Sequence, residues 1–212
     1  MKYEIAELIK RYPSLDSCKD SILDSLKVLK DCYKSGHKLL IAGNGGSSAD
    51  ADHIVGELMK SFKECRKVDS DLLKEVSKYD VDLSKCFENS LQKGLPAIAL
   101  HNHNGLNTAF INDVANGGEL MYAQQLLVYG EKDDVFLAIS TSGNSKNVYA
   151  AAVLAKAKGM KVVSLTGEGG GKLAKLADIA IKAPTKETFI VQEYHLPIYH
   201  FLCLNLEEEF FY

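Results

Sequence analysis

A histidine and a glutamate stand four residues apart, at His53 and Glu57, in a segment whose apolar residues recur at helical spacing. Four residues make about one helical turn, so both side chains leave the same face and can share a proton or a metal ion. The spacing alone also fits an ordinary surface contact. The pair becomes a candidate for chemistry because a glycine-rich turn comes directly before its helix.

A second group of polar side chains lies on the last predicted helix, which spans about residues 186 to 211. It comprises Gln192, Glu193, His195 and His200. Gln192 and His200 lie about 80° apart around an ideal helix axis, so both reach one site only if it lies between their directions. Pro197 between them predicts a bend or the start of a new helix. Ordinary polar groups on a helix surface would explain the same pattern.

The strongest local signal is the hydroxyl-rich run Ser140-Thr141-Ser142-Gly143-Asn144-Ser145, which follows an apolar segment at 135–139 and precedes a helical pattern. Such a turn offers hydroxyl groups, free backbone N–H groups and the positive end of a helix dipole to one anion. A second turn, Gly43-Asn44-Gly45-Gly46-Ser47-Ser48, follows the apolar segment 39–42 and opens the helix of His53. Together the two turns predict a small phosphorylated ligand at the carboxyl ends of a parallel sheet.

Three further motifs are weaker. The 43–48 turn departs from the dinucleotide fingerprint GxGxxG at its last position, and Gly169-Gly170-Gly171-Lys172-Leu173 lacks the hydroxyl residue that a P-loop places after its lysine. The second of these is better explained as a strand-to-helix turn. His101 and His103 follow a predicted strand and could bind a metal, although loops at strand ends are generally rich in such residues.

The order of the predicted elements indicates an α/β fold. Strands are expected at about 38–42, 96–100, 134–140, 161–165 and 179–181, with helices between them at about 48–62, 106–111, 119–128 and 145–158. Alternation of this kind requires right-handed crossovers and a parallel sheet that is covered on both faces. We therefore expect a three-layer α/β/α sandwich.

One segment, residues 66–93, interrupts this alternation with a charge-rich sequence. Asp69-Ser70 and Ser84 are possible caps for two short helices in it. A solvated helical insertion would explain the segment, and so would a lid or an oligomerisation arm. With 212 residues the chain suits a single domain, residues 1–212, that contains this insertion.

The composition argues against several classes of partner. Twenty-five lysines and arginines against 28 acidic residues give a formal charge of -3, which provides no electrostatic footprint for nucleic acid or an anionic membrane. The five cysteines are scattered and form no CxxC pair, which argues against a disulfide framework. The N-terminus lacks the apolar region of a signal peptide, and no run approaches the ~18 apolar residues of a membrane span. A cytoplasmic location is expected.

The combined pattern resembles the sugar isomerase (SIS) domain family, and within it the phosphoheptose isomerase branch. The residues that carry the resemblance are Gly43 to Ser47, His53, Glu57, Asn112-Asp113, Ser140 to Ser145, Leu165-Thr166-Gly167, Gln192-Glu193 and His200. The likeness covers nearly the whole chain except residues 66–93. It implies a flavodoxin-like SIS domain that interconverts sedoheptulose 7-phosphate and D-glycero-D-manno-heptose 7-phosphate through an enediol.

The resemblance also implies roles for individual residues. Glu57 and His200 match the proton-transfer pair, and His53, Glu57, Gln192 and His200 match positions that bind zinc in some members. The phosphate would be held by Ser140, Thr141, Ser142 and Ser145, and the sugar would contact Asn44, Gly45, Gly46, Ser47, Asn112, Asp113 and Gln192. The family is typically a homotetramer with its sites where subunits meet.

Two other functions are compatible with the same scaffold. One is a non-catalytic SIS protein of the type that binds a replication initiator, in which the positions of Glu57 and His200 have lost their acid and base side chains. The other is a sugar-phosphate sensor, or an isomerase for another phosphosugar. The insertion at 66–93 departs from the family pattern and bears on the length of the substrate.

Overall fold

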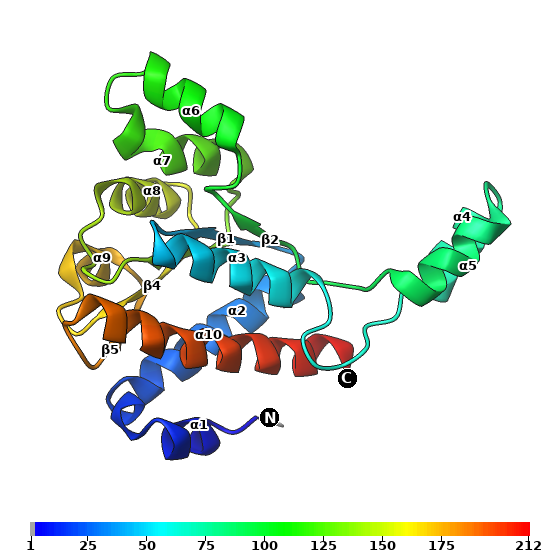
Figure 1. The fold of residues 1–212 in the computed structure, drawn as a ribbon, viewed down its shortest axis with the longest axis horizontal. Helices are drawn as coiled ribbons and strands as arrows, with labels where there is room; N and C mark the ends of the chain where they lie inside the picture. The colour runs from blue at the N-terminus through cyan, green and yellow to red at the C-terminus, as the bar shows by residue number, and fades with distance from the viewer. Residues whose placement is uncertain (1–2) are drawn as a thin grey trace.

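The computed structural model describes residues 3–212, which are built around a sheet of five parallel strands in the order β2-β1-β3-β4-β5 (Figure 1). The strands are β1 (Leu39–Ala42), β2 (Ala97–Ala99), β3 (Val135–Ile139), β4 (Lys161–Gly167) and β5 (Ile179–Ala183). This strand order is the flavodoxin-like one. From β1 the chain first adds β2 on one side of the sheet, and it then adds β3, β4 and β5 in turn on the other side of β1. A ligand crevice is expected at the carboxyl ends of β1 and β3.

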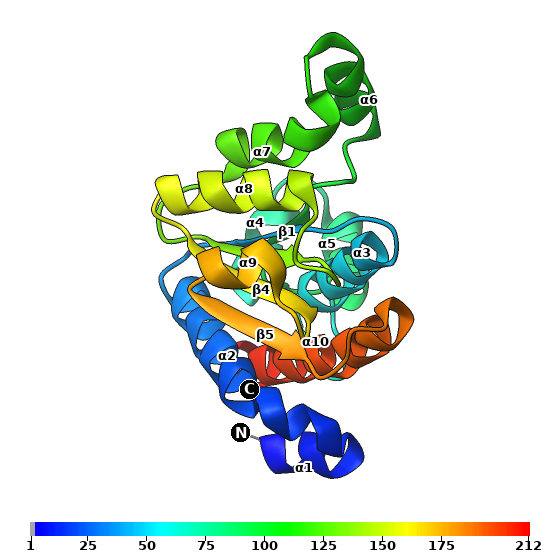
Figure 2. The ribbon, with the colours of Figure 1, turned by 90° about the vertical axis from the view of Figure 1, so that its left-hand side faces the viewer.

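Helices cover both faces of the sheet, as Figure 2 shows. Side chains of β3 alternate between two hydrophobic cores, with Val135, Leu137 and Ile139 in one and Phe136 and Ala138 in the other. Residues from α1 (Ile5–Arg11), α2 (Lys19–Lys34), α3 (Gly46–Met59) and α10 (Thr188–Phe211) contribute to the first core, and residues from α7 (Gly117–Tyr129), α8 (Lys146–Ala157) and α9 (Gly171–Leu176) to the second. The predicted three-layer α/β/α sandwich is confirmed.

Two details near the N-terminus differ from the sequence-based expectation. Helix α1 was not expected, and Asp16-Ser17, which as residue types predict a helix N-cap before the apolar residues of α2, lie inside a short 3-10 helix, Pro13–Cys18. Leu8 of α1 is buried and joins the first core. Tertiary packing of this one side chain helps to keep a helix too short to persist alone.

Helix α10 is continuous through Pro197, so of the two alternatives that this residue predicted, a bend or the start of a new helix, the second is wrong. Proline removes one backbone donor from the helix interior. The ring of Pro197 is buried, and helix residues before and after it pack against the first core. This continuity matters because α10 carries Gln192, His195 and His200 on one rigid element.

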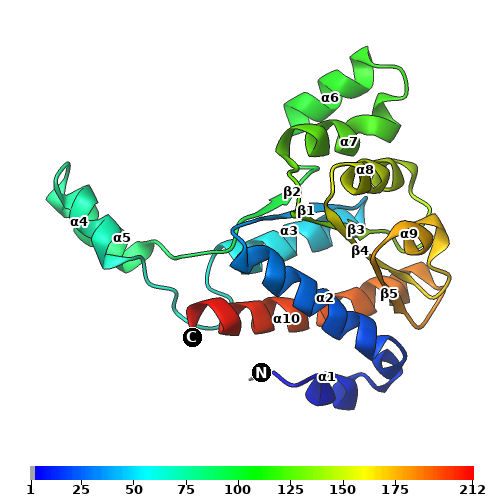
Figure 3. The same cartoon turned by 180° about the vertical axis from the view of Figure 1, so that it is seen from behind.

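Residues 66–93 form an arm made of two antiparallel helices, α4 (Ser70–Ser77) and α5 (Val81–Ser90), which projects away from the body beyond the C-terminal end of α10 (Figures 1 and 3). Asp69 precedes α4 as expected, whereas α5 is capped by Asp80, whose side chain accepts from the Leu83 N–H at 2.8 Å. Ser84 therefore lies inside α5. No residue of either helix is buried.

The base of the arm is anchored by a buried arginine. Arg66 is 2% exposed and donates from Nε to Glu207 Oε1 at 2.9 Å, from Nη1 to the Leu58 carbonyl at 2.7 Å and from Nη2 to the Glu57 carbonyl at 2.9 Å. Its guanidinium group lies 4.5 Å from the ring centroid of Phe211. Arg66 thus satisfies carbonyl groups at the end of α3 and ties this helix to α10.

Within residues 3–212, none of the helices combines the length and the apolarity that crossing a membrane requires.

Candidate active site

The two predicted turns lie side by side because β1 and β3 are adjacent parallel strands. Asn44 of the first turn and Asn147 of α8 exchange two side-chain hydrogen bonds, of 2.9 and 3.0 Å. Tyr122 of α7 donates its buried hydroxyl group to the Gly43 carbonyl at 2.7 Å. These contacts join both turns into one surface at the carboxyl edge of the sheet.

The hydroxyl-rich turn has the geometry of an anion site. Ser140 and Ser145 place their Oγ atoms 2.9 Å apart, and Ser142 Oγ accepts from the Asn144 N–H at 3.2 Å. Ser145 is the N-cap residue of α8, so the free N–H groups and the positive dipole end of a twelve-residue helix lie at this turn. The hydroxyl groups of Ser140, Ser142 and Ser145 therefore belong to one turn, which also contains Thr141 and forms a cradle suited to a phosphate group.

The glycine-rich turn at 167–171 braces this cradle. Gly143 has φ +64, and a Cβ atom on it would overlap the Gly170 carbonyl. Asn144 Oδ1 accepts from the Lys172 N–H at 3.1 Å, and the Leu173 N–H donates to the Gly143 carbonyl at 3.0 Å. The structure therefore supports a strand-to-helix turn here rather than a P-loop.

Gln192 lies over the start of α3. Its Nε2 atom is so close to Gly46 that a Cβ on this glycine would overlap it. The side chain is half-buried and lies at Gly46, the first residue of α3. The structure therefore brings Gln192 together with the turn that was predicted to contact the sugar.

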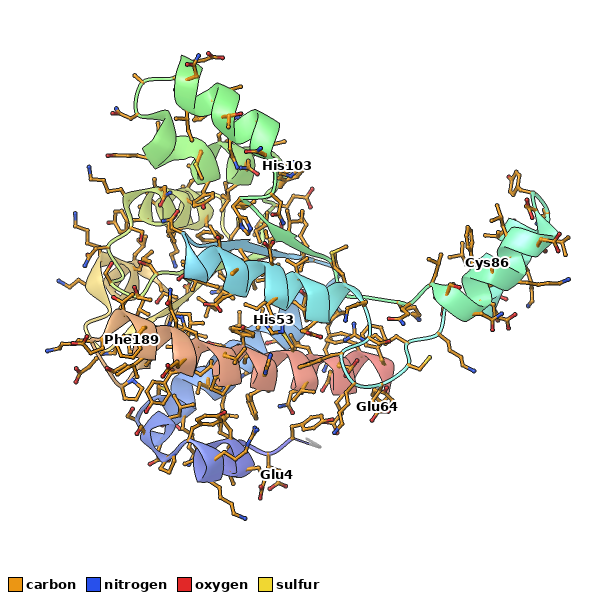
Figure 4. All side chains as sticks on the ribbon, viewed as in Figure 1. Glu4, His53, Glu64, Cys86, His103 and Phe189 are labelled. Carbon is orange, nitrogen blue, oxygen red and sulfur yellow. The ribbon has the colours of Figure 1, made fainter. Side chains whose placement is uncertain are left out.

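About two and three turns further along α3, His53 and Glu57 meet His200 of α10. We call these three side chains the carboxylate–imidazole cluster. His53 Nε2 lies 3.2 Å from Glu57 Oε1 and 3.4 Å from His200 Nε2. Figure 4 shows His53 between the two helices. Because α3 and α10 run in parallel, residues from distant parts of the sequence converge on one patch.

The cluster can transfer protons. Burial, followed by the neighbouring His53 imidazole, lowers the pKa of His200 below its ordinary value, which favours the neutral ring that can accept a proton. Glu57 has a side chain that is 14% exposed, so its carboxylate is reachable yet partly shielded from water. A carboxylate and a neutral imidazole at one point can serve as base and acid near neutral pH.

Not every predicted site residue lies at this point in a single chain. Gln192 and His200 are eight residues apart on one continuous helix, which corresponds to about 12 Å along its axis. Asn112 and Asp113 lie at the exposed end of α6 (Asn104–Asp113), where Asn112 Nδ2 donates to Asp113 Oδ1 at 2.8 Å. Helix α6 forms the outer edge of the molecule in Figure 1, away from α3 and α10.

The fit of these residues to a zinc ion is partial. The separations of 3.2 and 3.4 Å within the cluster match the ~3.3 Å spacing of tetrahedral ligands placed about 2.0–2.1 Å from zinc. However, no group of three or more His, Cys, Asp or Glu in residues 3–212 is arranged as a metal site. Gln192, the fourth expected ligand, stands at the other end of the helix pair. One chain alone thus offers an incomplete zinc site.

His195 is a buried structural histidine. It is fully buried, its Nε2 lies 3.3 Å from the Thr166 carbonyl, and its Nδ1 lies 4.0 Å from Asp50 Oδ2. Burial lowers its pKa to about 4. The ring is therefore neutral, donates to the carbonyl and holds α10 against β4.

We expect the stability of the protein to fall in acid partly through His195. The unfolded chain binds a proton below the ordinary pKa of 6.5, whereas the folded protein resists protonation until about pH 4. His195→Gln keeps a donor for Thr166 and removes this titration. Urea unfolding should show that the stability lost between pH 7.5 and pH 5 is about 2 kcal/mol smaller in the variant. Equal losses in both proteins would contradict the assignment.

His101 and His103 have separate partners and do not form a metal pair. His101 Nε2 lies 2.9 Å from Asp52 Oδ2, and His103 Nε2 lies 3.2 Å from the Tyr129 hydroxyl group. Their rings therefore take part in ordinary local contacts, which is the alternative that the sequence left open.

Several contributors to the site were not predicted from the sequence. Tyr122 and Asn147 hold the first turn, and Asp50 and Tyr199 lie beneath the cluster, where the Tyr199 hydroxyl group is 3.0 Å from His53 Nδ1. Burial raises the pKa of Asp50 to about 6 and that of Tyr199 above its ordinary value. Tyrosine at an apolar helical position is indistinguishable from core in a single sequence, so no sequence signal identified Tyr199.

The chain is similar in sequence to known proteins. The SIS domain model matches residues 107–202. The phosphoheptose isomerase of Aneurinibacillus thermoaerophilus is 40% identical over 181 residues, which are 85% of this chain and 77% of that protein.

Two solved structures extend the comparison to three dimensions. A phosphoheptose isomerase from Francisella tularensis superposes with a TM-score of 0.76 at 29% identity, over 93% of this chain and 91% of that one. The enzyme of Neisseria gonorrhoeae superposes with a TM-score of 0.74 at 28% identity, over 96% and 94%. The chain therefore belongs to the SIS domain family and, within it, to the phosphoheptose isomerases.

Proposed function

We propose that this protein is an aldose–ketose isomerase that interconverts sedoheptulose 7-phosphate and D-glycero-D-manno-heptose 7-phosphate. The observation that carries the proposal is the convergence of Glu57 and His200 on His53 Nε2 in a chain that also carries a hydroxyl-lined anion cradle. Family membership supplies the substrate class, because the relatives are phosphoheptose isomerases.

The proposed reaction moves one proton between adjacent carbons. In the ketose, a base removes a proton from C1, and the electrons form a C1–C2 double bond as the carbonyl oxygen at C2 gains a proton. The resulting enediol loses the proton of the C1 hydroxyl group and is protonated at C2, which yields the aldose. Glu57 removes the proton from C1 and delivers it to C2, and His200 transfers protons to and from the two oxygens. The cradle holds the phosphate in place during these steps.

We further propose that the working unit is a homotetramer whose sites are completed between subunits. Gln192 and the cluster lie about 12 Å apart along α10 in one chain, so a neighbouring chain is the natural source of the missing half of each site. Exposed apolar side chains flank the α3 and α10 face, namely Met59, Phe189 and Leu196.

Mixing two inactive variants, Glu57→Gln and Gln192→Ala, should then restore activity. If the mixture stays inactive although light scattering shows a mixed tetramer, each site is built from one chain.

A zinc ion would fit this assembly. His53, Glu57 and His200 of one chain with Gln192 of a neighbour would hold it, and a bound zinc ion would stabilise negative charge on the enediol oxygens. Elemental analysis should find up to one zinc per chain in the native protein and a lower zinc content in His53→Gln.

A cytoplasmic location is proposed as well, because the five cysteines are all unpaired.

The direct test is turnover. Purified protein is incubated with sedoheptulose 7-phosphate, with and without added zinc, and the aldose product is followed. We expect product formation with the heptose phosphate and less with pentose or hexose ketose phosphates. Absence of turnover under both conditions would refute the proposal and favour a protein that only binds, whose capture by a replication initiator should survive Glu57→Gln.

A further inference from the structure

Beneath the carboxylate–imidazole cluster lies a buried tyrosine whose hydroxyl group touches two side chains of α3. Tyr199 is 2% exposed, and its Oη lies 3.0 Å from His53 Nδ1 and 3.3 Å from Asp50 Oδ1. Its ring packs edge-on against both imidazoles, with centroid distances of 5.4 Å to His53 and 5.1 Å to His200. Tyr199 thus contacts both histidines of the cluster from the protein interior.

The direction of the two hydroxyl contacts follows from counting hydrogens. A phenol has one hydrogen, so Tyr199 can donate to only one of its two neighbours. A carboxylate offers acceptors only, and Asp50 Oδ2 is buried with no hydrogen-bond partner in the described part of the chain. If Tyr199 donated to His53, the Asp50 carboxylate would lose its donor at Oδ1 as well, which is unfavourable for a largely buried charge. The hydrogen therefore points to Asp50.

This direction determines the tautomer of His53. With its hydrogen given to Asp50, the Tyr199 oxygen accepts a hydrogen bond from His53, so the imidazole proton is on Nδ1. The lone pair then lies on Nε2, the atom that faces Glu57 at 3.2 Å and His200 at 3.4 Å. The His200 Nε2–H can donate to this lone pair, and a cation can bind between the lone pair and the Glu57 carboxylate, which as an anion has no hydrogen to give.

We propose that Tyr199, oriented by Asp50, is a positioning residue that fixes His53 as the Nδ1–H tautomer and so keeps the Nε2 lone pair at the reaction centre. The catalytic consequence rests on the isomerase function proposed above, whereas the tautomer does not. Partners of this kind, which hold the remote nitrogen of a functional histidine, commonly change activity or affinity by about 10–100-fold when they are removed.

The first experiment reads the tautomer directly. Protein labelled with 15N-histidine and freed of metal by a chelator is studied by long-range 1H–15N correlation, with the His53 signals identified from their absence in His53→Gln. In the wild type we expect a protonated Nδ1 and an unprotonated Nε2. Tyr199→Phe keeps the ring and removes the hydroxyl group, so the proton should move toward Nε2. Asp50→Asn should cause the same shift, because its amide group can donate to the phenol and turn the hydrogen toward His53.

The second experiment measures turnover. For Tyr199→Phe we expect kcat to fall by about 10–100-fold with KM for the heptose phosphate within about two-fold, since the cradle is untouched. Tyr194→Phe, which removes a phenol hydroxyl from a half-buried tyrosine of the same helix, is the matched control and should behave as wild type.

The outcomes separate the two proposals. A wild-type spectrum with the proton on Nε2, or a spectrum that neither variant alters, overturns the assigned tautomer. A shifted tautomer with unchanged kcat overturns the positioning role. If the wild type does not isomerise heptose phosphates, the proposed function fails while the spectra still decide the tautomer.

Discussion

Replacing Glu57 with glutamine should lower kcat for the heptose phosphate by about 10²–10⁴-fold, the usual contribution of a positioned acid or base. Glutamine has nearly the same shape as glutamate but cannot take a proton from carbon. His53 Nε2, 3.2 Å from Glu57 Oε1, keeps a polar neighbour in the variant, so the cluster should stay assembled. The measurement is initial rate at saturating substrate, with product formation followed over time.

Binding should separate from chemistry in this variant. The proposed phosphate cradle, Ser140, Thr141, Ser142 and Ser145, follows β3 and does not include Glu57, so calorimetry should give a Kd for the phosphosugar close to that of wild type. Ser142→Ala is the opposite control, because losing a hydrogen bond to a charged group weakens binding by about 1.5–3 kcal/mol, which is roughly 10–150-fold in Kd. Normal turnover by Glu57→Gln would mean that the base is another residue.

The fold was predictable because its strands are unusually easy to recognise. Residues 39–42 and 135–139 are continuous apolar runs that are buried on both faces, a pattern that a parallel sheet requires. A last helix over about residues 186–211 was predicted, but its course at Pro197 was not, since the local cost of this proline is offset by packing that no local rule contains. Helix α1 was missed for a similar reason, because a seven-residue helix depends on its tertiary contacts.

The candidate site was predictable where it depends on chain topology. Turns that follow neighbouring parallel strands must meet, so Asn44 and the Ser140 turn were expected together, and they are joined through Asn147. The arrangement of Gln192 and His200 was harder to predict. Their angle of about 80° allows a shared site, but their separation of about 12 Å along the axis prevents it in a single chain. Tyr199 was not identified because its role depends on a contact between two helices.

The second large effect is expected for stability, at the buried pair of Arg66 and Glu207. Removing one member of a buried ion pair leaves an uncompensated charge and costs about 3–5 kcal/mol. Arg66→Met keeps a long apolar side chain but leaves the Glu207 carboxylate without its 2.9 Å guanidinium partner, so that only the backbone N–H groups of Phe62 and Lys63 still bond it. The variant also removes the side-chain donor from the Glu57 and Leu58 carbonyl groups, of which Leu58 keeps the Leu95 N–H. Urea unfolding should therefore show a loss of this size.

An exposed pair provides the control for Arg66. Lys74 and Asp71 form an ion pair of 2.9 Å on the arm, with side chains 73% and 89% exposed, and Lys74→Met should change stability by less than about 0.5 kcal/mol. A loss below about 1 kcal/mol in Arg66→Met would show that water or a rearranged side chain replaces the guanidinium group. Because Arg66 bonds the Glu57 carbonyl, the same variant should also lower kcat under conditions where it is still folded, since the end of α3 that carries the base loses its attachment to α10.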